Sequence, residues 1–121
     1  MTGMKFDGGK PKWSLLMHGL HHSLAGVVAV LSFGAIKYAE DSWQEVDDGY
    51  NRYKNALYRH LAAIEELGPL SVDIDMQPND EGVLVDKGSG LLHWFHIACD
   101  ALFCAWFAAK LAREAAAKAT H

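Results

Sequence analysis

The most restrictive feature of this chain is the segment SGLLHWFHIACDALFCAWF, residues 89–107. It predicts a helix, because no proline or glycine follows Gly90 and the Ser89 hydroxyl can cap the first turn. The segment is apolar on every side, so we expect the helix to be buried on every side. Three polar residues interrupt it at helical spacing, which places His93, His96 and Asp100 on one face.

That polar face requires a partner, because an ionised carboxylate is strongly destabilised in an apolar interior. Basic side chains, a metal ion or a water-filled cleft would each provide one. A hydrogen-bonded core residue is the plainer interpretation of either imidazole alone, whereas two imidazoles and a carboxylate together favour a site. The same polar groups argue against a membrane span, although the segment is about long enough.

The composition indicates a single domain, residues 1–121, with an ordinary hydrophobic share of 50%. Eleven basic and 15 acidic residues give a net charge of −4, which argues against broad affinity for nucleic acid or anionic membranes. Cys99 and Cys104 would point away from each other on one helix, which favours reduced thiols and a cytoplasmic protein. The N-terminus lacks the apolar core of a signal peptide.

Two groups of cationic residues are candidates for binding phosphate. The first lies in residues 1–13, an irregular arm in which Lys5 and Lys10 flank a diglycine; the alternative is a solvated leader. The second lies on a helix predicted for residues 50–67, which Gly68-Pro69 ends. Arg52 and Arg59 share one face of that helix and could grip phosphates as planar donors.

The remaining segments predict supporting structure. Residues 15–38 are expected to form one helix or a pair of helices, because their apolar residues recur near helical period. Residues 39–49 are a polar loop in which Trp43 is either a local packing anchor or a platform for a base. Residues 71–87 alternate between apolar and acidic side chains, which predicts a small β-hairpin whose acids are solvated rather than cation ligands. Residues 108–121 continue the last helix as an alanine-rich tail.

Several short motifs follow one another along the chain: KFDGGKPK (5–12), FGAIKY (33–38) with Trp43, Arg52 with YRHL (58–61), and Asp86 with SGLLHWFHIACDALF (89–103). Their order resembles the phage dATP/dGTP diphosphohydrolase family, relatives of the MazG all-α nucleotide pyrophosphohydrolases. The resemblance implies an all-α helical bundle that assembles as a homo-oligomer, a dimer or a tetramer. It implies hydrolysis of dGTP or dATP to the monophosphate and pyrophosphate, with Mg²⁺ or Mn²⁺. Some relatives, called MazZ, supply dGMP for the synthesis of 2-aminoadenine in phage DNA.

The carboxylates of a MazG-type site are mostly missing from this chain. Such sites resemble an ExxE pair facing an ExxD pair, and Asp100 matches only the last acid of that pattern. Ile97 stands three residues earlier, where the pattern has an acid, and Gly88 replaces the usual acid before Ser-Gly. Histidines are therefore the expected substitutes, and nitrogen ligands favour Mn²⁺ or a later metal over Mg²⁺.

The resemblance and the residue chemistry together assign three sets of residues. The expected catalytic residues are His60, His96 and Asp100. The expected metal ligands are His60, Asp86, His93, His96 and Asp100. The expected substrate-binding residues are Lys5, Asp7, Lys10, Lys37, Tyr38, Trp43, Arg52 and Arg59. The alternative is a non-catalytic helical module that binds nucleotides or partners, and an HD-type phosphohydrolase is disfavoured because no His-Asp pair occurs. No nucleic-acid or membrane partner is expected, and a phage-encoded chain would act in the cytoplasm of its bacterial host.

Overall fold

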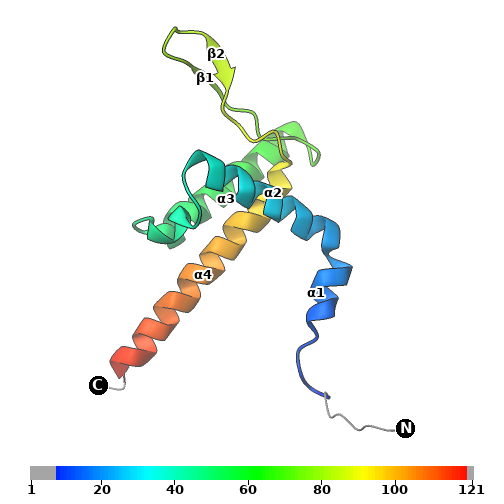
Figure 1. Cartoon of the computed structure of the whole chain (residues 1–121), viewed down its shortest axis with the longest axis vertical. Coiled ribbons are helices and arrows are strands. Elements are labelled where there is room, and N and C mark those ends of the chain that lie inside the picture. The colour runs from blue at the N-terminus through cyan, green and yellow to red at the C-terminus, as the bar shows by residue number, and fades with distance from the viewer. Residues whose placement is uncertain (1–7, 120–121) are drawn as a thin grey trace.

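The structure is a computed structural model that describes residues 8–119. Its helices are α1 (Trp13–Gly19), α2 (His21–Lys37), α3 (Gly49–Leu67) and α4 (His93–Ala119), with a short 3₁₀ helix η1 (Ser42–Glu45). Two short antiparallel strands, β1 (Met76–Pro78) and β2 (Leu84–Asp86), form a hairpin that projects from one end of the helices (Figure 1). The prediction of a mainly α-helical fold with a small hairpin insertion is thus confirmed.

The first predicted helical unit consists of two helices. Leu20 leaves the helical conformation, with φ −117° and ψ 25°, and the axes of α1 and α2 differ by 83°. This bend at Leu20, the α1–α2 elbow, directs α1 away from the other helices (Figure 1). No residue of α1 is buried.

Helix α3 follows its local signals closely. Its predicted bounds, 50–67, differ by one residue from those of the structure. Gly68 adopts φ +101°, a conformation that side chains disfavour, and its N–H donates to the Ile64 carbonyl at 2.7 Å. The helix therefore ends where the Gly-Pro pair predicts.

Helix α4 is the longest helix, and α2 and α3 pack against it. The small aliphatic core joins Val27 and Val30 of α2 to Cys99 of α4. Gly26 lets the helices approach, because the Phe95 ring occupies the space where a β-carbon would stand. This packing orients the first turns of α4 toward α2 and α3.

The start of α4 differs from the prediction. The helix begins at His93, not at Ser89, and Gly90 has φ +70°. The residues before it pair with the segment that leads into the hairpin: Asp73 N donates to Leu91 O at 2.8 Å, and Gly90 N donates to Asp73 O at 2.9 Å. Extended pairing with a distant segment therefore replaces the predicted first helical turn, and Ser89 does not cap a helix.

The expectation that this helix is buried on every side was wrong for the single chain. Within α4 only His93, Cys99, Asp100 and Phe107 are buried, whereas Leu102 and Leu111 are each 55% exposed. Helices α2 and α3 pack against α4 and leave these two side chains uncovered. Helix α4 has the length and hydropathy of a membrane span, and α1 with α2 pass the same test as a bent pair. A core helix of a soluble protein has the same composition, so these two findings are weak evidence for a membrane protein.

Candidate functional site

A cleft of about 940 Å³ opens between α2, the loop after it, α3 and α4. It is the place where most of the predicted functional residues meet. Its lining includes Lys37, Tyr38, Trp43, Arg52, Arg59, His60, His96 and Asp100, together with Asp73, which the sequence analysis did not single out. Segments far apart in the chain thus build one concavity with cationic, aromatic and acidic walls.

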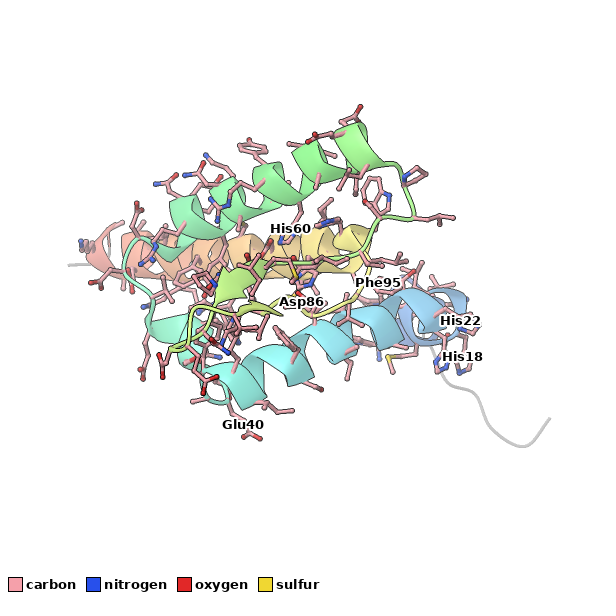
Figure 2. All side chains as sticks on the ribbon, turned by 90° about the horizontal axis from the view of Figure 1, so that it is seen from above. His18, His22, Glu40, His60, Asp86 and Phe95 are labelled. Carbon is pink, nitrogen blue, oxygen red and sulfur yellow. The ribbon has the colours of Figure 1, made fainter. Side chains whose placement is uncertain are left out.

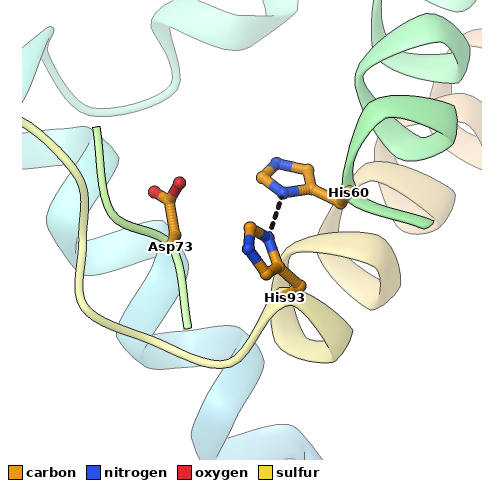
Figure 3. Close-up of side chains that lie close together, drawn as sticks. All are labelled: His60, Asp73 and His93. Atoms are coloured by element: carbon orange, nitrogen blue, oxygen red, sulfur yellow. Dashed lines mark hydrogen bonds between the residues drawn. The ribbon is translucent and has the colours of Figure 1, made fainter. Parts of the chain in front are cut away.

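Three histidines converge beside this cleft. His60 of α3 and His93, the first residue of α4, bring their Nδ1 atoms to 2.8 Å (Figure 3). One of the two rings therefore carries a proton at Nδ1 and donates it to the other. The His60 ring also stacks on that of His96, with centroids 4.6 Å apart. His93 is buried and the other two are half-buried.

Burial keeps at least two of these imidazoles neutral. It lowers the pKa of His60 to about 4, and the neighbouring His96 and His93 reinforce that shift. Burial also lowers the pKa of His96, although the Asp73 carboxylate opposes the effect. Both rings are therefore uncharged near pH 7, which is the form that can bind a metal ion or accept a proton.

Asp73 approaches the histidines from the segment before the hairpin. Its Oδ2 accepts hydrogen bonds from Ser89 N at 3.1 Å and Ser89 Oγ at 3.4 Å, and it lies 3.6 Å from His96 Nε2. Ser89 Oγ lies 2.6 Å from the same His96 nitrogen. Both oxygen partners thus meet one ring nitrogen, so the three residues do not form a Ser-His-Asp nucleophilic triad, in which the acid binds the other nitrogen.

Asp100 lies one helical turn beyond His96. It is buried, and its Oδ2 has no hydrogen-bond partner among residues 8–119. Burial raises the pKa of this carboxyl to about 7, although the Arg59 guanidinium acts in the opposite direction. The predicted burial of the polar face is thus confirmed for His93 and Asp100, and the Asp100 Oδ2 lacks, among residues 8–119, the partner that the sequence analysis required.

The cationic and aromatic residues are less enclosed. Arg52 and Arg59 are exposed along α3, and Lys37 is exposed at the end of α2, where its Nζ approaches Lys87 O at 3.5 Å. Trp43 stacks on Phe103 with centroids 4.2 Å apart. Phe103 therefore covers one face of the Trp43 ring, which favours the interpretation of Trp43 as a packing anchor. Trp43 nevertheless lines the cleft.

Several predicted residues lie away from the cleft. Asp86 is an exposed residue of β2 whose Oδ1 accepts hydrogen bonds from Asp75 N and Gly88 N, each at 2.9 Å. These two bonds lower the pKa of its carboxyl, so that its visible role is to hold the base of the hairpin. Lys10 is exposed in a turn and does not line the cleft. Lys5 and Asp7 lie outside the described residues.

The residues that can hold a metal ion come from three segments. One ligand atom each of His60, Asp73 and His93 lies within 4.8 Å of the others. Figure 3 shows the two rings facing each other and the Asp73 carboxylate beside them. Other histidines lie far from this group: His18 and His22 stand at the α1–α2 elbow, remote from His60 (Figure 2). The alternating pattern of residues 71–76 indicated that Asp73 lies on an extended segment, but not which residues it would face.

Comparisons with known proteins identify one family. A family model described as dATP/dGTP diphosphohydrolase, N-terminal, matches residues 1–117. No curated protein matches the chain, and no solved structure does.

Proposed function

The chain belongs to the dATP/dGTP diphosphohydrolase family, and we propose that it hydrolyses a purine deoxynucleoside triphosphate to the monophosphate and pyrophosphate. The observation that carries this proposal is the convergence of cationic, imidazole and carboxylate side chains in one cleft. Its volume of about 940 Å³ is within the range typical of small-molecule sites.

The cationic side chains are suited to the triphosphate. Arg52 and Arg59 present planar donors on one face of α3, and Lys37 reaches the same cleft from α2. We assign these three residues to the phosphates, together with Lys5, Asp7 and Lys10 of the N-terminal arm. Tyr38 and Trp43 are assigned to the base, with the exposed Tyr38 ring the freer of the two.

The donor types in the polar cluster support a proposal that it binds a divalent cation. The orphaned Asp100 Oδ2 and the neutral imidazoles are donors of the kind that Mn²⁺ accepts, and Mg²⁺ is the alternative. We propose His60, His93, His96 and Asp100 as the residues that would hold it. Asp86 fits less well, because backbone N–H groups already occupy its Oδ1. When bound, such an ion neutralises phosphate oxygens and acidifies water.

The reaction also needs a base. Water adds to phosphorus, the bond between the α- and β-phosphates breaks, and one proton of the water must be accepted. His60 and His96 are uncharged near pH 7 and line the cleft, so either can accept that proton. Asp100 would position the reacting groups from the floor of the cleft.

The test is a panel of deoxynucleoside and ribonucleoside triphosphates with Mg²⁺ or Mn²⁺, in which the phosphate products are separated. We expect pyrophosphate from dGTP or dATP. His96→Ala and Asp100→Asn should each slow turnover by about 100-fold or more, as expected for lost electrostatic groups. Arg59→Ala should raise KM, whereas Arg113→Ala, an exposed arginine on the distal part of α4, serves as the matched control.

A second candidate function is a nucleotide-binding module without catalysis. It is favoured because the four-acid pattern of MazG-type sites is absent from the sequence. Tight nucleotide binding without release of pyrophosphate in the same panel would select this alternative. Release of tripolyphosphate would contradict both candidates.

We also propose that the chain assembles as a homo-oligomer, a dimer or a tetramer. A folded 13.3-kDa monomer is expected to expose roughly 6,500 Å², whereas this chain exposes 9320 Å². Exposed apolar side chains account for part of the excess, and they include Trp13, Leu15 and Ile36. A second copy of the chain would cover such a surface. Light scattering behind size-exclusion chromatography should give a multiple of the chain mass, and a 13.3-kDa particle at micromolar concentration would refute the proposal.

The biological role proposed here follows from the product. If dGTP is the substrate, the dGMP released would supply 2-aminoadenine synthesis in a phage, and the enzyme would act in the cytoplasm of the host bacterium. Preference for dATP, or equal use of all eight triphosphates in the panel, would argue against this role.

A further inference from the structure

Asp73 supplies a carboxylate where the sequence lacks the expected acids. It lies on the segment that enters the hairpin, whereas His60 belongs to α3 and His93 begins α4. One ligand atom of each lies within 4.8 Å of the other two. We infer that His60, His93 and Asp73 form a binding site for a transition-metal ion, and that this site discriminates against Mg²⁺.

The spacing of the two imidazoles suits a shared ion. Their Nδ1 atoms face each other at 2.8 Å. Two nitrogens bound to one ion at about 2.1 Å lie roughly 3.0 Å apart at a right angle and roughly 3.4 Å apart in a tetrahedron. The rings that share the hydrogen bond in Figure 3 would therefore become a pair of ligands if they separated by a few tenths of an ångström, rotated so that their lone pairs converged on the ion, and lost the shared proton.

The third ligand is held in place before any ion binds. The backbone of Asp73 is fixed on both sides, because its N–H donates to Leu91 O and its carbonyl accepts from Gly90 N. Its Oδ2 accepts from Ser89, and no residue in the described range 8–119 donates to its Oδ1. Hydrogen bonds of this kind orient metal ligands and reduce the cost of ordering them on binding.

The ligand set determines which metals are preferred. Imidazole nitrogens suit Zn²⁺, Co²⁺ and Fe²⁺, and two histidines with one carboxylate leave positions open for water or a substrate. Mg²⁺ prefers oxygen ligands in an octahedron, and this site offers only one carboxylate. The inference deepens the cation requirement proposed above, but metal binding itself does not depend on nucleotide hydrolysis.

Metal binding can be measured without nucleotide. Protein freed of metal with a chelator is titrated with Co²⁺, followed by visible absorption, and with Zn²⁺ and Mg²⁺, followed by calorimetry. All proteins carry His18→Asn, His21→Asn and His22→Asn, so that the three exposed histidines of the elbow cannot contribute. We expect one Co²⁺ or Zn²⁺ per chain, bound at least about 100-fold more tightly than Mg²⁺.

Variants identify the ligands. Asp73→Asn, which keeps the shape of the side chain, should weaken Co²⁺ binding at least 10-fold and change its absorption spectrum. His93→Gln should do the same. Asp75→Asn is the matched control, because Asp75 lies two residues away on the same segment and its Oδ2 accepts only from Gln77 among the described residues. Far-UV circular dichroism verifies that each variant is folded, and His60→Gln replaces His93→Gln if the latter is not.

Three outcomes would overturn the inference: no Co²⁺ binding, equal affinity for Mg²⁺, or Co²⁺ binding that Asp73→Asn leaves unchanged. If Asp100→Asn abolished binding while Asp73→Asn had no effect, the ion would lie deeper in the cleft. Metal binding through Asp73 in a protein that releases no pyrophosphate would support this inference and contradict the proposed function, so the two can fail separately.

Discussion

Asp100→Asn should make the metal-free protein more stable above pH 7 while it abolishes the proposed activity. The folded protein buries this carboxyl and leaves its Oδ2 without a hydrogen-bond partner among residues 8–119. Burial raises its pKa to about 7 from a usual value of 3.8. An asparagine of the same shape carries no charge at any pH, so it avoids the cost of burying an ionised carboxylate.

The sign and size of the effect follow from the two pKa values. Between pH 4 and pH 7 the unfolded chain loses the Asp100 proton while the folded chain keeps it, so the wild type loses stability as the pH rises. Each unit of difference between the pKa values of Asp100 in the folded and unfolded chains corresponds to about 1.4 kcal/mol. The full cost is therefore about 4 kcal/mol above pH 7, and relaxation with water entry reduces it to between about 1 and 4 kcal/mol. Near pH 4 the two proteins should be equally stable.

The assay is urea unfolding of both proteins at pH 4 and pH 8, in chelator and at one protein concentration, because assembly makes stability depend on concentration. Asp86→Asn is the control of opposite sign. Its exposed carboxylate accepts two backbone N–H bonds that lower its pKa, so this variant should lose stability at pH 8 and lose less of it in a further measurement at pH 3, below the usual value of 3.8. The reasoning is refuted if Asp100→Asn is less stable than the wild type at pH 8, since the carboxylate would then be ionised and paired in the fold.

Three further predictions concern packing. Gly26→Ala should lower the free energy of unfolding by about 1–3 kcal/mol in urea titrations, because the new β-carbon overlaps the Phe95 ring. A thiol reagent should modify Cys104 before Cys99, whose side chain is 2% exposed and whose thiol pKa burial raises to about 12; two equally fast thiols would contradict the packing. Trp43→Ala should cost roughly 2 kcal/mol of stability, since half-buried aromatic packing is lost, and Trp43→Phe should restore most of it.

The parts of the fold that could be predicted from the sequence are those with local causes. The helix of residues 50–67 ends at Gly68 because that glycine adopts a conformation other residues disfavour. The spacing of His93, His96 and Asp100 placed them on one face, and the structure buries the first and the last. The hairpin followed from alternation and from the turn residues between its strands.

The start of the last helix could not be predicted, because its cause is not local. Residues 89–92 are predicted to begin the helix, with Ser89 in the capping position. They leave the helical conformation, with Gly90 at φ +70°, and exchange backbone hydrogen bonds with residues 71–75 across the base of the hairpin. The same pairing moves Ser89 from a helix cap to a contact with His96 and Asp73. A pattern read along one segment does not identify such a distant partner.

The proposed metal-binding group shows the same limit. His60 and His93 are separated by the whole hairpin insertion, and nothing in the spacing of either helix indicates that their Nδ1 atoms meet. Asp73 belongs to an alternating acidic segment, for which solvated side chains are the ordinary outcome. Its approach to the histidines depends on the pairing of residues 71–75 with residues 87–93. Tertiary structure therefore brings these residues together. The sequence contains each of them but does not indicate that they meet.

The length of α4 explains why its first turns are partly buried and its later turns are exposed. The first turns carry His93, His96 and Asp100 against α2 and α3, which shield His96 and Asp100 enough to lower the pKa of the His96 imidazole and raise that of the Asp100 carboxyl. The later turns extend past both helices and leave Leu111 exposed (Figure 1). The single chain leaves the apolar side chains of these later turns exposed to solvent. Burial against another surface would stabilise them. A second chain packed on the distal turns would stabilise α4 without covering the cleft, so assembly and access to the site are compatible.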